Sequence, residues 1–205
     1  MPNYHNAFAA IYQGRFLAGV AAGMKLNEMI ENGEFDASEA QIGYIGAYPY
    51  AEVISGYTSF YLGARYICPS ATMKIVYTNS WYDEALEKEG AVALIAAGSK
   101  LISQHADSMG APSACENAGV PNISYNGSTE ASCPNTFIIS SRINWVPYFL
   151  YIIDCVKNDA PIVRDWVGTI DNDAVMLTDI NENAAAPGTA EKLEEIREML
   201  QSGDL

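Results

Sequence analysis

The sequence predicts an α/β protein in which a parallel sheet is flanked by helices. From Gln41 onward, short apolar strands alternate with helical segments, which is typical of parallel strands joined by crossover helices. The stretch Met73–Asp83 shows one such unit, because Lys74–Thr78 is rich in β-branched and aromatic residues and Asp83 is a natural helix N-cap. With 205 residues, nearly half of them apolar, the chain is long enough for one compact domain or for one domain and part of another.

The chain opens with a predicted helix over residues 6–27, followed by a polar, acidic loop over residues 28–40. Small residues recur along this helix at helical spacing, and they are Gly14, Ala18 and Ala22 together with Gly19 and Gly23. Such a pattern favours close packing against a neighbouring element, and we expect that use here.

Strands and helices then alternate. The predicted strands cover residues 42–47, 74–78, 100–104, 120–125 and 137–141. The predicted helices cover residues 52–66, 83–97 and 111–119, and they end before Pro69, at Gly98 and at Gly119, respectively.

The last third departs from this alternation. Residues 145–157 form a strongly apolar predicted helix that tolerates Pro147 in its first turn. The chain after Pro161 is predicted to be irregular, and a strand over 174–178 and an amphipathic helix over 189–201 follow.

Polar and aromatic residues follow the predicted strands at the end where each strand stops. Because the carboxyl ends of parallel strands meet at one edge, and ligands of open α/β sheets bind there, these residues are candidate ligand contacts. They are Tyr48, Trp81, His105, Asp107, Asn126 and Asn144. Trp81 offers a large ring for stacking on a planar ligand. For His105 and Asp107 the sequence leaves two interpretations open, namely groups that orient a polar ligand or members of a solvated loop.

The acidic composition bears on the kind of partner that the chain can bind. A net charge of −14 argues against a surface for nucleic acid or anionic membranes. No signal peptide, lipid-anchor cysteine or spanning segment is recognisable, and we expect no cofactor. The four cysteines are too widely spaced for a metal or redox motif, so buried free thiols are expected, with a Cys115–Cys133 disulfide as the alternative.

An enzyme is one alternative function. His105 and Asp107, with Ser80 or Ser108, are the residue types of a hydrolase, but no Gly-x-Ser-x-Gly elbow is present and the chain has only two histidines. Metal triads, phosphate-binding Gly-rich loops and dinucleotide fingerprints are also missing from the sequence, so we expect no catalytic activity.

Five segments, in order, resemble the basic membrane protein family, the purine-nucleoside-receptor-like substrate-binding lipoproteins of ABC transporters. They are Ile11–Gly19, Ile42–Pro49, Thr78–Asp83, Gln104–Ser108 and Asn144–Trp145. The resemblance implies a type I periplasmic-binding-protein fold, with two α/β lobes joined by three crossing strands and the ligand in the cleft. It also implies an ABC transporter permease as partner and an extracytoplasmic, membrane-anchored lipoprotein as the full-length form.

The same resemblance divides the chain into three parts. Residues 1–142 correspond to the second lobe, 143–172 to a returning helix and connection that pack on the first lobe, and 173–205 to a C-terminal strand and helix. Family members carry a whole sheet before the segment at Ile11–Gly19, so we expect most of the first lobe to be absent here. The apolar helix over 145–157 would then keep an uncovered face, which predicts self-association.

Within the resemblance, Trp81 matches the aromatic residue that stacks on the base. Asn126 and Ser128 stand where many members have aspartates that bind ribose hydroxyls, and Ile143 stands where some have lysine or tryptophan. Asn126 can still donate and accept hydrogen bonds but lacks the charge that strengthens them. The predicted function is a solute-binding component of an ABC uptake system for purine nucleosides or related heteroaromatic compounds. A ligand-sensing domain of a receptor or regulator with the same fold is the alternative.

Overall fold

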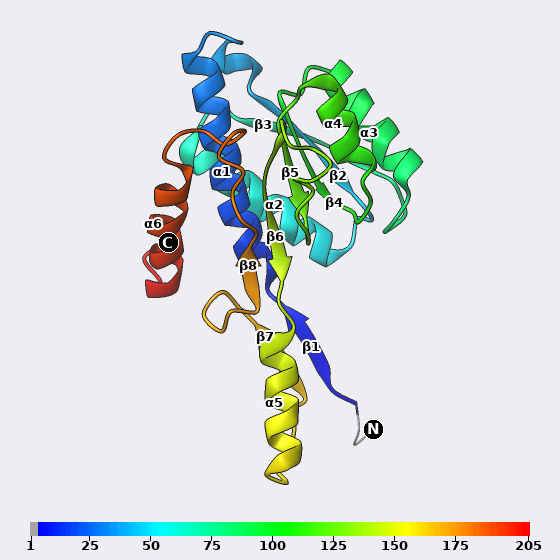
Figure 1. Ribbon diagram of the computed structural model, residues 1–205, viewed down its shortest axis with the longest axis vertical. Coiled ribbons are helices and arrows are strands. Elements are labelled where there is room, and N and C mark those ends of the chain that lie inside the picture. Colours follow the sequence, from blue (N-terminus) through cyan, green and yellow to red (C-terminus); the bar gives the residue numbers. More distant parts are fainter. Residues whose placement is uncertain (1–3) are drawn as a thin grey trace.

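A six-stranded sheet forms the centre of the structure, a computed structural model that describes residues 4–205 (Figure 1). Its strand order is β3-β2-β4-β5-β6-β8, and all neighbours are parallel except β8, which runs antiparallel to β6. A separate parallel pair joins β1 to β7. The elements in chain order are β1 (Asn6–Ala9), α1 (Ile11–Glu31), η1 (Ala37–Glu39), β2 (Gln41–Gly46), α2 (Ala51–Ile67), β3 (Thr72–Tyr77), α3 (Glu84–Ala96), β4 (Leu101–His105), α4 (Gly110–Ala118), β5 (Asn122–Tyr125), β6 (Phe137–Ile143), α5 (Val146–Lys157), β7 (Asp165–Gly168), β8 (Val175–Leu177) and α6 (Thr189–Ser202). The α/β class, with a parallel sheet flanked by helices, is confirmed.

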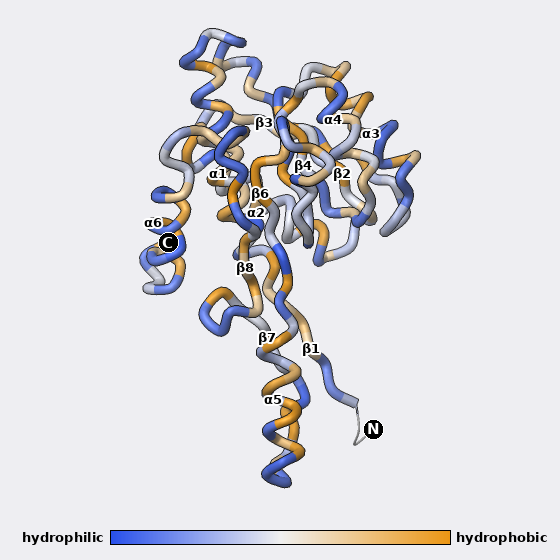
Figure 2. Tube along the Cα trace, in the orientation of Figure 1, coloured by the Kyte–Doolittle hydropathy of each residue, from blue (hydrophilic) through white to orange (hydrophobic). Residues whose placement is uncertain are grey.

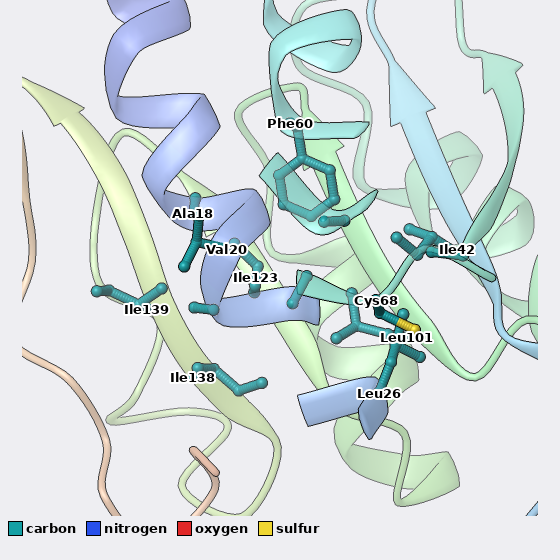
Figure 3. Packing of buried hydrophobic residues seen from close by; sticks show 14 of the residues in the cluster. Ala18, Val20, Leu26, Ile42, Phe60, Cys68, Leu101, Ile123, Ile138 and Ile139 are labelled. Carbon is teal, nitrogen blue, oxygen red and sulfur yellow. The ribbon is translucent and has the colours of Figure 1, made fainter. Parts of the chain in front are cut away.

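Alternating side chains of the central strands divide the core between the two faces of the sheet. On β2, Ile42 and Tyr44 belong to the larger cluster with α1 and α2, whereas Ile45 belongs to a second cluster with α3 and α4. Phe60 of α2 packs edge-on against Tyr44, with ring centroids 5.6 Å apart. Figure 3 shows Phe60 and Ile42 within the larger cluster, beside residues of α1 and β6. Both faces are therefore covered, as a parallel sheet requires.

Helices α1 and α2 approach each other closely through glycine. A Cβ atom on Gly19 would overlap the carbonyl oxygen of Phe60, and one on Gly63 would overlap the carbonyl oxygen of Phe16. The expectation that the small residues of the first helix serve close packing is thus confirmed, and the partner is α2.

Two predicted segments at the N-terminus were wrong. Residues 6–9 form β1 rather than helix, because Asn6–Ala9 pairs with Asp165–Gly168, a partner too distant in sequence for local patterns to reveal. The helix begins at Ile11 and continues to Glu31, into the stretch predicted as loop.

The prediction of irregular chain after Pro161 was also wrong, because Asp165–Gly168 is the strand that pairs with β1. The division of the chain at residue 142 stays a prediction, and the structure adds that β1 lies with β7 and α5. In Figure 1 these three elements extend away from the six-stranded sheet.

Helix α5 is rich in apolar residues, which appear as orange segments of the trace in Figure 2, and most of them are not buried. Of its twelve residues only Cys155 is buried. Its exposed apolar residues are Val146, Phe149, Leu150, Ile153 and Val156. We call these five residues the α5 face.

All four cysteines are free and buried, so the expectation of buried thiols is confirmed and the alternative Cys115–Cys133 disulfide was wrong. Burial raises the pKa of Cys133 to about 11 and raises that of Cys115 as well. A buried, protonated thiol is a weak nucleophile.

Candidate ligand-binding site

Aromatic rings gather where β2 and β3 end. The ring centroids of Tyr48 and Trp81 are 5.6 Å apart, and Tyr50 stacks on Tyr48 at 4.8 Å with an interplanar angle of 8°. Trp81 is 37% exposed and Tyr50 is 55% exposed, so these rings lie at the surface and not in the hydrophobic interior. We call Tyr48, Tyr50 and Trp81 the aromatic rim. Open ring faces of this kind can stack on a flat, apolar or heteroaromatic molecule.

The loop between β3 and α3 presents Trp81. Thr78 Oγ1 donates to the carbonyl of Ser80 at 2.8 Å and accepts from its backbone N–H at 3.3 Å, which fixes the start of the loop. Asp83 accepts a hydrogen bond from the N–H of Leu86 at 3.0 Å and begins α3, so the predicted N-cap is confirmed. The indole is thereby held between a strand end and a capped helix.

Asp107 lies next to Trp81, because its N–H donates to the Trp81 carbonyl at 2.9 Å. Two buried side chains brace this loop. The carboxylate of Glu87 on α3 accepts from the N–H of Ser108 at 3.2 Å, and Gln104 Nε2 donates to the Ser108 carbonyl at 3.1 Å. Burial raises the pKa of Glu87. The sequence analysis did not predict that Glu87 and Gln104 support this loop.

A signal for Glu87 was present in the sequence. Glu87 shares the inward face of its helix with Ala91 and Leu94, and all three are buried. An acid at helical spacing from apolar core positions indicates a carboxylate that accepts hydrogen bonds inside the protein.

His105 lies behind the rim rather than on it. Its side chain has 0% exposure, its ring stacks on Tyr125 with centroids 4.0 Å apart, and a Cβ atom on Gly56 would lie 2.5 Å from its Nδ1. Burial lowers the pKa of His105, so the ring is neutral. Within the part of the chain that the structure describes, neither ring nitrogen has a hydrogen-bond partner, so His105 is not hydrogen-bonded to Ser80 or Ser108.

Glu52 is a further residue that the sequence reasoning missed. It occupies the first turn of α2, two positions after Tyr50, and its Oε1 lies 3.8 Å from Nε2 of His105. The sequence did hold a sign of its position, because the strand is interrupted at Tyr48–Tyr50 and a helix follows at once. A helix that starts directly after a strand places its first turn at the carboxyl edge of the sheet, where ligands bind.

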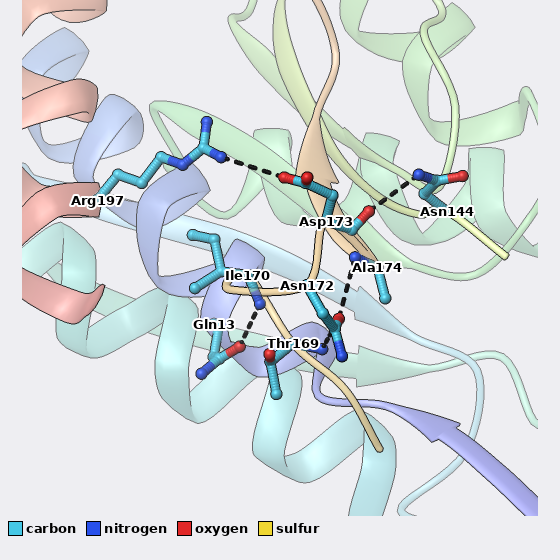
Figure 4. A network of polar contacts seen from close by, with 8 residues as sticks. All are labelled: Gln13, Asn144, Thr169, Ile170, Asn172, Asp173, Ala174 and Arg197. Carbon is cyan, nitrogen blue, oxygen red and sulfur yellow. Dashed lines mark hydrogen bonds and ion pairs between the residues drawn. The ribbon is translucent and has the colours of Figure 1, made fainter. Parts of the chain in front are cut away.

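Asn126 and Asn144 lie at the ends of β5 and β6, on the other side of β4 from the rim. Asn126 Oδ1 accepts from the N–H of Ile143 at 3.3 Å, and Asn144 Nδ2 donates to the carbonyl of Asp173 at 2.9 Å (Figure 4). With strands spaced about 4.8 Å apart, three strand spacings separate β2 from β6, or roughly 14 Å. The structure therefore groups Tyr48, Trp81 and Asp107, while both asparagines make contacts that connect neighbouring strands and loops.

Arg15 of α1 joins three strands beneath these ends. Its guanidinium donates to Ser103 Oγ on β4 at 2.6 Å, to the Ser124 carbonyl on β5 at 3.1 Å and to Ser141 Oγ on β6 at 3.3 Å. The side chain is fully buried, its guanidinium carbon lies 4.8 Å from the ring centre of Phe60, and no carboxylate pairs with it among residues 4–205. Neutral acceptors thus hold a buried cation one or two residues before the strand ends.

A cavity of about 200 Å³ lies between α1, β8 and α6, and none of the rim residues lines it. Its walls are mostly aliphatic, and Arg197 at its border pairs with Asp173 at 3.5 Å. Figure 4 shows how the loop that carries Asp173 is also held by Gln13, whose Oε1 accepts from the N–H of Ile170 at 2.9 Å. These contacts connect the loop between β7 and β8 to α1 and α6.

Comparison with known proteins decides the family. The family described as ABC transporter substrate-binding protein PnrA-like matches residues 3–201. The chain belongs to this family. The description of this family names a substrate-binding role in ABC transport, which is the role expected from the sequence.

The chain is also similar to two curated proteins and to a solved structure. A purine-binding protein of Brucella abortus is 32% identical over 142 residues, which cover 69% of this chain and 37% of the relative. A Haloferax volcanii protein named as a glucose-binding protein of an ABC transporter is 35% identical over 139 residues, 68% of this chain and 33% of that protein. A solute-binding protein of an ABC transporter system from Conexibacter woesei superposes with a TM-score of 0.77 at 22% identity, over 100% of this chain and 65% of that structure.

These matches confirm the periplasmic-binding-protein fold expected from the sequence. The chain spans about a third of the length of the two curated relatives and about two thirds of the solved structure. Among residues 4–205, no helix combines the length and hydropathy that a bilayer span needs.

Proposed function

We propose that this chain is a ligand-binding lobe of an ABC uptake system and that its ligand is a purine nucleoside or a related heteroaromatic compound. The aromatic rim carries the proposal, because three rings at the carboxyl edge of a parallel sheet provide a stacking surface where ligands of such sheets bind. The purine-binding relative from Brucella abortus supports the choice of ligand. In this proposal Tyr48, Trp81 and Asp107 contact the ligand, and His105, Asn126 and Asn144 hold the surrounding strand ends.

The wider context is part of the same proposal. The full-length form would act outside the cytoplasmic membrane as a lipid-anchored protein and would deliver its ligand to a permease. Proteolipid labelling of the full-length form in its native cells tests the anchor.

Calorimetry of the full-length form with adenosine, guanosine, inosine, free purine bases and glucose tests the ligand class. We expect heat with at least one purine compound and none with glucose. Because stacking of a base on an aromatic side chain is worth about 1–3 kcal/mol, Trp81→Ala should weaken purine binding by roughly 5- to 150-fold.

The matched control is Tyr82→Ala, which removes a neighbouring ring that is 65% exposed and lies outside the aromatic rim. It should bind like the unmodified protein. Binding of glucose alone, or equal losses in the two variants, would end the purine assignment.

We also propose that this chain self-associates through the α5 face. Several exposed apolar side chains on one helix form the kind of surface that marks an interaction site. Sedimentation velocity should show a larger species whose fraction rises with concentration, and Leu150→Glu should shift it toward monomer. Leu62→Glu on α2, at 56% exposure against 60% for Leu150, is the matched control and should leave association unchanged. A monomer at all concentrations would rule the interface out.

A further inference from the structure

Two carboxylates border the aromatic rim. Glu52 follows Tyr50 in the first turn of α2, and Asp107 is joined through its backbone to Trp81. Over the described range 4–205, no lysine or arginine forms an ion pair with either carboxylate. Neither acid thus has a cationic lysine or arginine partner, and each is attached to the backbone close to a rim residue.

The two carboxylates also affect each other. Partial burial and the charge of Glu52 together raise the pKa of Asp107. For Glu52, the neighbouring His105 ring lowers the pKa against the opposite effect of burial, so Glu52 is the more acidic member. At neutral pH the pair presents several oxygen lone pairs and no donor of its own.

The buried ring of His105 points to the same place. Its Nε2 faces Glu52 at 3.8 Å, which is beyond hydrogen-bond distance, and its two ring nitrogens have no hydrogen-bond partner in the described chain. Because the ring is neutral, it cannot balance the charge of Glu52. The Glu52 side chain is 31% exposed, and its carboxylate can therefore accept from a molecule bound at the rim.

We propose that Glu52 and Asp107 are the specificity-determining residues of the site, which accept N–H or O–H donors, or face a positive charge, on the ring held by the aromatic rim. This inference rests on the function proposed above and narrows its ligand class. Neutral molecules rich in donors and cationic heteroaromatic molecules bind, and anionic ones are repelled. The charge-assisted hydrogen bonds that the carboxylates accept are stronger than neutral ones, so the pair discriminates by chemistry that stacking alone cannot provide.

The first test measures nucleoside affinity in Glu52→Gln and Asp107→Asn, which keep shape and remove charge. Each should weaken adenosine binding by about tenfold or more, while Glu89→Gln, an exposed acid on α3, should leave it unchanged. Purine riboside lacks the exocyclic amine and 2′,3′-dideoxyadenosine lacks the hydroxyls. If a carboxylate accepts from the group that one analogue lacks, then removing that carboxylate should no longer weaken the binding of that analogue.

The second test does not need a purine. 1-Methylnicotinamide and nicotinate are flat rings of opposite charge, and the unmodified protein should bind the cation more tightly than the anion. In Glu52→Gln this preference should shrink, and the pKa of Asp107, followed by NMR, should fall.

The pH dependence of cation binding tests the same two carboxylates. As the pH falls through the raised pKa of Asp107, its carboxylate is protonated and affinity for the cation should fall; in Glu52→Gln that loss should move to lower pH. Charged or titratable groups nearby are Glu52, Glu87, His105, Tyr125 and the buried Arg15.

The outcomes separate the two proposals. Cation preference without purine binding would remove the purine assignment and keep the carboxylate pair. Purine binding that is unaffected in both variants, or equal binding of the cation and the anion, would overturn the role of the pair. Binding of neither flat ring, together with an unchanged pKa of Asp107 in Glu52→Gln, would overturn it as well.

Discussion

Replacing Gly19 by alanine should destabilise the protein by about 3 kcal/mol or more, because the added methyl group would overlap the backbone carbonyl of Phe60. Alanine gains about 1 kcal/mol of helix propensity over glycine, so the clash outweighs the gain. For a chain of this size the midpoint of thermal unfolding should fall by roughly 6–12 °C. Calorimetric unfolding measures it directly.

Gly127→Ala is the control, since no heavy atom lies within 4 Å of the position that its Cβ would occupy. Its free energy of unfolding should change by less than about 0.5 kcal/mol. Gly63→Ala should behave like Gly19→Ala, because it faces the carbonyl of Phe16 at the same helix crossing. Equal stability of Gly19→Ala and Gly127→Ala would show that α1 and α2 are not packed this closely.

Arg15→Ala should cost about 3–5 kcal/mol of stability. The change removes the donor that joins Ser103, Ser124 and Ser141, and it leaves a cavity against Phe60. Arg15→Met keeps an unbranched apolar side chain in that space and also removes an unpaired buried charge. It should therefore cost less, about 1–2 kcal/mol.

Urea unfolding of the two Arg15 variants gives these values, with Arg142→Ala as the exposed control on β6. The control should change stability by less than about 0.5 kcal/mol. A larger loss in Arg15→Met than in Arg15→Ala would mean that packing is not what makes the arginine stabilising.

The strands of the central sheet could be predicted from the sequence because each of them is marked by residues within or directly beside it. Strands β2 to β6 are short, apolar and bounded by glycine, proline or caps such as Asp83, and each is followed along the chain by its own helix or turn. β1 and β7 carry no comparable signal. Each has four residues and is a strand only because it pairs with the other, about 160 positions away in the sequence. The residues next to a strand give no sign of so distant a partner.

In the candidate site, too, some residues could be predicted from the sequence and others could not. Tyr48, Trp81 and Asp107 could be found because strand ends in a parallel sheet share an edge. Sequence order does not say how far apart those ends lie across the sheet, and so it grouped Asn126 and Asn144 with the rim. It also could not show that the His105 ring is enclosed between Gly56 and Tyr125, because burial of one ring depends on helix packing from another part of the chain.

The enclosure of all four native thiols offers a practical route to watching this protein work. A single cysteine introduced at Tyr82, which is 65% exposed, would be the accessible nucleophilic sulfur, and maleimide dyes would attach there without first removing Cys68, Cys115, Cys133 or Cys155. A fluorophore at that position sits one residue from Trp81, whose indole can quench it. Ligand arrival would then register as a change in brightness.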